Sequence, residues 1–186
     1  MQYKSIELLE ELSLITQENL NFGISLKSIP DEKLQFKIKD DSWSVLECLE
    51  HLNLYGNFYL PEIDKRIKAS NLSFDDVFKS GFLGNKFAND MLPKENMKTM
   101  NTFKSKNPIH SNLNKEKVLN IFIKQQVQIL DLLEIAKTKN LTKIKTSITL
   151  PLLKFRLGDT FRFVINHNIR HVAQAENILK IKIETK

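Results

Sequence analysis

Two histidines near the C-terminus, His167 and His171, are the residues of this chain whose side chains and spacing best suit a chemical role. They lie four residues apart in a segment, 159–180, that has the apolar periodicity of a helix. Residues four apart on a helix project from the same face about one turn apart, so both imidazoles can reach one ligand. This spacing is typical of a metal-binding pair. Two core histidines that only satisfy each other or a backbone carbonyl would show it as well.

A third histidine, His51, lies in a second segment with a helical pattern, 45–60, on an apolar face. Burying three imidazoles without partners costs several kcal/mol, whereas a divalent metal gives all three the same partner and fixes their tautomers. The sequence therefore predicts a metal site formed by His51, His167 and His171. The inward stripe predicted for the last helix consists of Thr160, Val164, His167, His171, Gln174 and Ile178.

Three neutral imidazoles leave a coordination position open for water or substrate, which is the pattern of a catalytic zinc site. Zinc suits this donor set, and nickel or another first-row ion can compete with it. Other chemistries lack their motifs: Asn168 replaces the glutamate of the zincin motif, and di-iron, haem, nucleotide and Gly-x-Ser-x-Gly hydrolase signatures are missing. The sequence therefore favours a mononuclear metal centre.

Two residues close to His51 have alternative roles. Ser44 and Glu47 have the spacing of a capping box, which gives Glu47 a structural role at a helix start. The alternative is that its carboxylate, one turn from His51, supports that ligand or handles protons. The single cysteine, Cys48, cannot form an intramolecular disulfide, and its apolar neighbours predict a buried, inert thiol.

Four long amphipathic segments are predicted to be helices, and they cover residues 2 to 22 or 24, 45 to about 69, 114 to 137 or 139, and 159 to about 180. Gly23 and Pro30 should end the first helix, Pro61 should kink the second or start a new first turn, and Gly158-Asp159 should cap the last. The third carries a stripe that faces inward, namely Leu119, Phe122, Gln126, Ile129, Leu133 and Ala136.

Residues 71–112 form a long irregular segment with room for short helices, and His110 within it should be exposed. The linker at 144–151 should hold one extended piece. The resulting prediction is an all-α fold, a four-helix bundle with a long irregular crossover between helices 2 and 3, formed by residues 1–186 as a single domain.

Composition further limits the classes of function and partner that we expect. The chain has 41% hydrophobic and 27% charged residues, which is typical of soluble globular proteins. The net charge of +6 comes mainly from scattered lysines without arginine forks and interleaved aromatic residues, so we expect no nucleic-acid partner. No stretch is apolar enough to cross a membrane or to form a signal peptide. A cytoplasmic location is the expectation.

The order of several motifs resembles the DinB-like superfamily, the DinB/YfiT-like metalloenzymes. These motifs are Trp-Ser-Val-Leu-Glu-Cys-Leu-Glu-His-Leu at 43–52, Phe-Leu-Gly at 82–84, Leu-Pro at 92–93, Leu-Gly-Asp at 157–159 and His-Asn-Ile-Arg-His-Val-Ala-Gln-Ala-Glu at 167–176. The resemblance implies a four-helix bundle with a divalent metal held by one histidine of the second helix and two of the last. It carries over to His51, His167 and His171. Among the polar residues that match the last motif, we assign Gln174 to the pocket and Arg170 to a structural ion pair.

The resemblance also suggests a reaction, because some DinB-like proteins are S-transferases or isomerases that use a small thiol such as bacillithiol or mycothiol. We expect metal-dependent transfer of a small thiol to an electrophile, with Tyr55 lining the pocket. One alternative is hydrolysis by metal-activated water, and another is a non-catalytic scaffold that the metal staples together. The scaffold would have its metal plugged by a side chain of the Phe82 to Phe103 loop. A homodimer through bundle faces suits either function.

Overall fold

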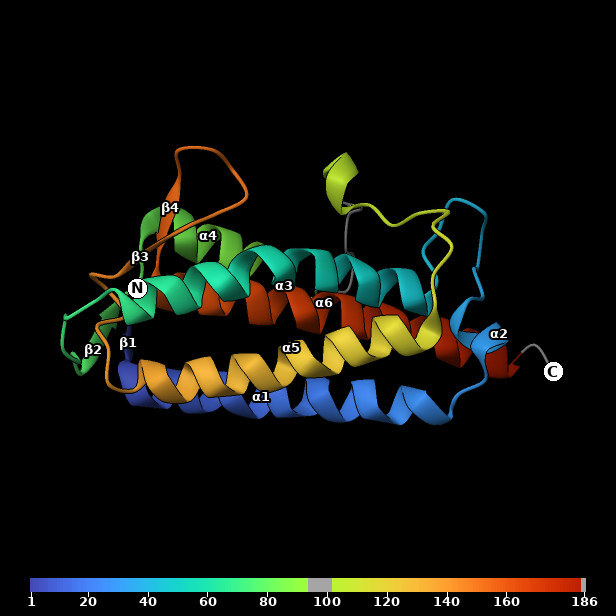
Figure 1. The fold of residues 1–186 in the computed structure, drawn as a ribbon, viewed down its shortest axis with the longest axis horizontal. Coiled ribbons are helices and arrows are strands. Elements are labelled where there is room, and N and C mark those ends of the chain that lie inside the picture. Colours follow the sequence, from blue (N-terminus) through green and yellow to red (C-terminus); the bar gives the residue numbers. More distant parts are fainter. Residues whose placement is uncertain (94–101, 185–186) are drawn as a thin grey trace.

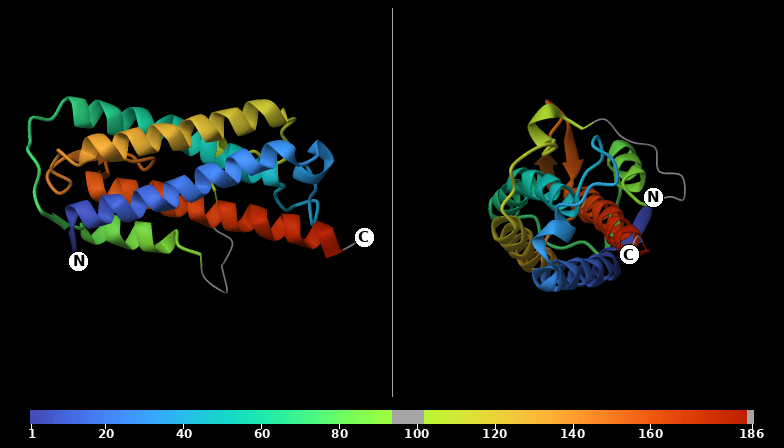
Figure 2. Two further views of the ribbon diagram at one scale, coloured as in Figure 1. Left: turned by 90° about the horizontal axis from the view of Figure 1, so that it is seen from below. Right: turned by 90° about the vertical axis from the view of Figure 1, so that its right-hand side faces the viewer.

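The computed structural model describes residues 1–93 and 102–184, and this part of the chain is mostly helical (Figure 1). Its long helices lie side by side along the long axis of the molecule (Figures 1 and 2). They are α1 (Ser5–Ser25), α3 (Val45–Lys68), α5 (Lys115–Ala136) and α6 (Leu157–Glu184). The prediction of an all-α fold is confirmed.

Each long helix packs against two of the others. α5 contacts α1 and α3, and α6 contacts the same two helices from the other side, so the four surround a common interior when viewed along their axes (Figure 2, right). The inward stripe predicted for α5 is buried throughout. This periodic burial of one face explains why amphipathic helices of this length associate.

Shorter elements lie in the connections between the long helices and before the first of them. They are β1 (Gln2–Lys4), the 3₁₀ turn η1 (Leu26–Ser28), α2 (Asp31–Leu34), β2 (Val77–Lys79), α4 (Phe82–Asp90), the 3₁₀ turn η2 (Lys104–Lys106), β3 (Lys145–Ser147) and β4 (Lys154–Arg156). β1 pairs antiparallel with β2, with Tyr3 opposite Phe78, and β3 pairs antiparallel with β4. The crossover predicted at 71–112 thus contains a strand, a helix and a turn, and its residues 94–101 lie outside the described part.

The predicted start of α3 is confirmed in detail. The Ser44 hydroxyl accepts a hydrogen bond from the N–H of Glu47 at 3.2 Å, and the Glu47 carboxylate accepts one from the N–H of Ser44 at 2.8 Å. This capping box satisfies two donors that a helix start leaves open. α3 then continues through Pro61 to Lys68 as one helix, so the alternative of a new helix at Pro61 is wrong.

The first helix differs from its prediction at its start, and it ends one residue beyond the longer predicted bound at residue 24. Residues Gln2–Lys4 form strand β1, because they pair with β2. At the other end, α1 continues through Gly23 to Ser25. A Cβ atom at Gly23 would lie 2.8 Å from the Phe122 ring, so this glycine allows α1 and α5 to approach closely.

The prediction that Asp159 caps the last helix is wrong. Asp159 lies inside the first turn of α6, and its fully buried carboxylate accepts hydrogen bonds from the N–H of Gly81, at 2.8 Å, and from the Ser80 hydroxyl. Arg162, one turn along, donates to Asn85 at 3.0 Å. These bonds attach α4 to α6. None of the helices in the described part of the chain combines the length and the apolar character that a membrane-spanning helix needs.

Candidate metal centre

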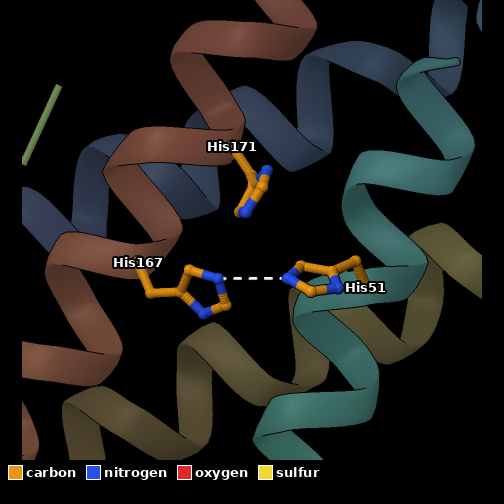
Figure 3. Close-up of side chains that lie close together, drawn as sticks. All are labelled: His51, His167 and His171. Carbon is orange, nitrogen blue, oxygen red and sulfur yellow. Dashed lines mark hydrogen bonds between the residues drawn. The ribbon is translucent and has the colours of Figure 1, made fainter. Parts of the chain in front are cut away.

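Three imidazoles meet in the interior between α3 and α6 (Figure 3). His51 extends from α3, and His167 and His171 extend from successive turns of α6 toward it. One ring nitrogen from each lies within 4.8 Å of the other two. The Nε2 atoms of His51 and His167 are 3.1 Å apart, as the dashed line in Figure 3 marks. The structure thus brings together the three histidines that the sequence predicted as ligands.

All three imidazoles are nearly inaccessible to solvent, with exposed fractions of 2% for His51, 6% for His167 and 8% for His171. Desolvation by burial lowers the pKa of His51 to about 4 and the pKa of His171 to about 3. It also lowers the pKa of His167 well below its usual value, and the positive charge of Arg170 adds to this effect. The imidazoles are therefore neutral at pH 7, which is the form that binds a metal ion.

Hydrogen bonds on the outer side fix the tautomers of two imidazoles. Nδ1 of His51 lies 2.6 Å from the carbonyl oxygen of Lys106. A carbonyl can only accept, so Nδ1 of His51 carries the proton and Nε2 keeps its lone pair. Nδ1 of His171 donates in the same way to Oε1 of Gln174 at 3.0 Å. Histidine ligands of metals in proteins usually show this arrangement, in which the second nitrogen donates to an oxygen.

The donor set fits a divalent first-row metal ion. The group consists of three neutral nitrogen donors from His51, His167 and His171, and it includes no carboxylate. His51 and His167 share one hydrogen bond, but within the described residues none joins His171 to either of them, so hydrogen bonds among the imidazoles satisfy only part of the group. Nitrogen donors suit zinc and nickel, whereas magnesium and calcium prefer oxygen ligands. These residues could therefore hold such an ion.

Two aromatic side chains enclose the imidazoles. The ring centroid of Trp43 lies 4.6 Å from His51 and 5.4 Å from His171. The ring centroid of Tyr55 lies 4.9 Å from His51 and 4.7 Å from His167. Tyr55 therefore borders the site, where the sequence placed it. Both rings restrict the orientation of the imidazoles and keep water away from them.

Residues 102–110 of the crossover, which we call the covering segment, lie across this site. Several hydrogen bonds hold the segment. Nδ1 of His51 donates to the Lys106 carbonyl, Nζ of Lys106 donates to the Leu54 carbonyl at 2.6 Å, and Nε1 of Trp43 donates to Oδ1 of Asn107 at 3.2 Å. Sequence reasoning missed Lys106 and Asn107. No local pattern marks them, because their position depends on the path of the whole crossover.

Of the two roles predicted for Glu47, the structure shows the structural one, at the start of α3. Besides capping α3, its Oε1 atom accepts hydrogen bonds from Nζ of Lys37 at 2.8 Å and from the N–H of His110 at 2.9 Å. The side chain is buried, and within the described residues no hydrogen bond joins it to His51. The carboxylate thus anchors the end of the covering segment to α3.

The remaining predicted residues lie as follows. Gln174 is half-buried and contacts His171, and half-buried Arg170 lies next to His171 in the chain and lowers its pKa electrostatically. Cys48 is buried, as predicted, and desolvation raises the pKa of its thiol. His110 is exposed, as predicted, and has a left-handed backbone with φ of 60°.

A cavity of about 10 Å³ borders the site, with His167, Tyr55 and Asn168 among its lining residues. This volume admits about one water molecule, so larger molecules do not fit without movement of the surrounding chain. Phe82 and Phe103, at the ends of the loop that would plug an inactive site, are 86% and 49% exposed. Residues 94–101 of that loop lie outside the described residues.

The chain is thus a mostly helical protein whose buried histidine group could hold a divalent metal ion. A family model described as the DinB superfamily matches residues 17–175, a range that includes all three histidines, and the chain therefore belongs to this superfamily, as the resemblance predicted. No match was found among curated proteins or among solved structures.

Proposed function

We propose that this protein is a metal-dependent enzyme that transfers a low-molecular-weight thiol to an electrophilic substrate. A divalent ion, zinc or nickel, would be held by His51, His167 and His171 in the interior of a four-helix bundle. The observation that carries the proposal is the group of three buried, neutral imidazoles without a carboxylate. The thiol-dependent activity that the DinB-like resemblance implies supports the same reaction.

When bound, the ion would supply charge to this chemistry, because a divalent metal with only neutral ligands keeps its full positive charge and would stabilise the thiolate form of a small thiol near neutral pH. The protein supplies the geometry. Lys106 and Gln174 orient His51 and His171 through their outer nitrogens. Trp43 and Tyr55 exclude water from the imidazoles.

The nucleophile comes from outside the protein in this proposal. Cys48, the only cysteine, is fully buried, and desolvation raises the pKa of its thiol, so it stays protonated and unreactive. The sulfur of the external thiolate forms a bond to the electrophilic carbon, and the leaving group departs with the bonding electrons. The proton of the thiol passes to water. A reducing cytoplasm would suit both the thiol and the free cysteine.

Access to the site requires movement of the chain. The cavity beside His167 holds about 10 Å³, and the covering segment is hydrogen-bonded to Trp43, His51 and Leu54. Thiol and electrophile therefore reach the imidazoles when this segment moves outward. Its bond to Trp43 is a side-chain contact at the surface, which opens at less cost than core packing.

A second function is favoured by the same burial. If the covering segment stays closed, the ion would join α3 to α6 as a staple, and the protein would be a metal-stabilised binding or scaffold protein. Such a metal raises the melting temperature through its preference for the native state, but a catalytic metal does so too. A measurement of catalytic turnover is therefore needed to distinguish the two functions.

The experiment is a screen of the zinc-loaded and nickel-loaded protein with several biological thiols and a chromogenic aryl halide. We expect turnover that requires both thiol and metal and that is lost in His51→Ala. The exposed histidine provides the matched control, since His110→Ala should retain turnover. Failure of every thiol to exceed the His51→Ala background would favour the scaffold. Release of the leaving group without any thiol would indicate hydrolysis by metal-activated water.

A further inference from the structure

The charges around the three histidines indicate which thiols the site would accept. We propose that Lys106 binds a carboxylate of the thiol substrate and thereby selects thiols that carry one. This inference rests on the proposed thiol transfer and deepens it by naming a substrate class. It concerns the side chain of Lys106, whereas the backbone carbonyl of the same residue orients His51.

The ammonium group of Lys106 lies close to the site. Its Nζ atom donates to the carbonyl of Leu54 at 2.6 Å and lies 5.7 Å from the ring centroid of Tyr55. The Tyr55 ring itself lies 4.9 Å from His51 and 4.7 Å from His167. The ammonium and two of the three imidazoles therefore lie around the same aromatic ring. When the covering segment moves to admit a thiol, a carboxylate a few bonds from the sulfur could meet Lys106, which this segment carries, while the sulfur faces the imidazoles.

The positive charge of Lys106 is not balanced by an acidic side chain of the described residues. No ion pair involves Lys106 in the part of the chain that the structure describes. The buried carboxylate of Glu47 is engaged by Lys37 and by two backbone N–H groups. Lys106 is half-buried, so its charge is partly withdrawn from water.

The ammonium group of Lys106 has hydrogen-bonding capacity left for an anion. It has three N–H donors, and within the described residues only the carbonyl of Leu54 engages one of them, so two remain for a carboxylate. Hydrogen bonds between charged groups are stronger than neutral ones, which gives the contact selectivity.

Two probes test the proposal, N-acetylcysteine and N-acetylcysteine amide, which share a skeleton and differ in the carboxylate. Each is titrated into the nickel-loaded protein, and binding is followed by thiolate-to-nickel absorption and by the fluorescence of Trp43, the only tryptophan in the chain. Because the two thiols differ in acidity, the measured quantity is the ratio of their dissociation constants in each variant. We expect Lys106→Gln to weaken the acid about tenfold while leaving the amide unchanged.

Two further variants make the test specific. Lys106→Arg keeps the charge and should keep the wild-type ratio, which also shows that the covering segment remains folded. Lys104→Gln removes one exposed positive charge from the same 3₁₀ turn and should leave the ratio unchanged. An unchanged ratio in Lys106→Gln, or an equal change in Lys104→Gln, would overturn the proposal.

This design distinguishes a failure of the proposed carboxylate binding from a failure of the proposed thiol transfer. If the dissociation constant of the acid relative to that of the amide rises in Lys106→Gln but no thiol is turned over, the carboxylate site stands and the proposed transfer is wrong. If turnover occurs with a ratio that Lys106→Gln does not change, the transfer stands and the role of Lys106 is overturned.

Discussion

The carbonyl oxygen of Lys106 lies 2.6 Å from Nδ1 of His51, so a residue of the crossover completes a site whose candidate ligands lie on two long helices. This contact holds the proton of His51 on its outer nitrogen and leaves Nε2 free to act as a ligand. The ammonium of the same residue lies over Tyr55. Lys106 thus influences both the orientation of one imidazole and the charge beside it.

The Glu47→Ala variant should lose stability without losing the metal site. The substitution removes the reciprocal cap of α3 and the bonds to Lys37 and to the N–H of His110, so we expect a loss of about 1–3 kcal/mol in the free energy of unfolding. Urea denaturation of the metal-free protein measures this loss. Glu50→Ala, which removes a carboxylate from the same helix outside the cap, should cost less. Loss of metal from a folded Glu47→Ala protein would instead give this carboxylate a role at the site.

Cys48 should be inert in the native protein. Because it is fully buried and desolvation raises the pKa of its thiol, an aromatic disulfide reagent at about pH 8 should label it only after unfolding in urea. Cys48→Ala should support the same thiol transfer as the wild type, since the nucleophile is external. Rapid labelling of the native protein, or loss of transfer in a folded Cys48→Ala variant, would contradict this prediction.

The stability of the metal-free protein should depend on pH through its buried histidines. Burial lowers their pKa values from 6.5 to about 4 for His51 and to about 3 for His171, so the unfolded chain binds more protons in this range. These groups therefore leave stability unchanged above about pH 6.5 and decrease it as the pH falls through 6.5 toward 4. Urea denaturation at several values between about pH 7 and pH 5 measures the slope.

Two variants test whether the buried histidines cause this dependence of stability on pH. His167→Gln removes one buried imidazole and should flatten the dependence, whereas His110→Gln, at an exposed position, should leave it steep. A wild-type stability that does not change between about pH 7 and pH 5 would show that the imidazoles are not desolvated in solution.

Helical periodicity accounts for the features of the site that the sequence could predict. The spacing of His167 and His171, and the start of α3 at Ser44, depend on residues within one or two turns of a helix. The contribution of Lys106 could not be predicted in this way, because His51 lies 55 residues away and is reached only through the path of the crossover.

Two errors in the predicted fold have the same origin. Gly23 would end a helix in isolation, but the close approach of Phe122 from α5 favours a glycine inside the helix. Asp159 resembles a cap in sequence, but its carboxylate bonds to the start of α4, a helix that lies far away in the chain. In both cases the tertiary partner, which the local pattern does not contain, decided the outcome.

The metal content of protein purified without a histidine tag tests the central claim most directly. After growth with zinc and nickel, mass spectrometry of the wild type should find about one divalent ion per chain. His167→Ala and His171→Ala should lose most of it, and His110→Ala, the exposed control, should retain it. A wild-type protein without a bound divalent ion, or unchanged occupancy in His167→Ala, would contradict the assignment of His51, His167 and His171 as the metal ligands.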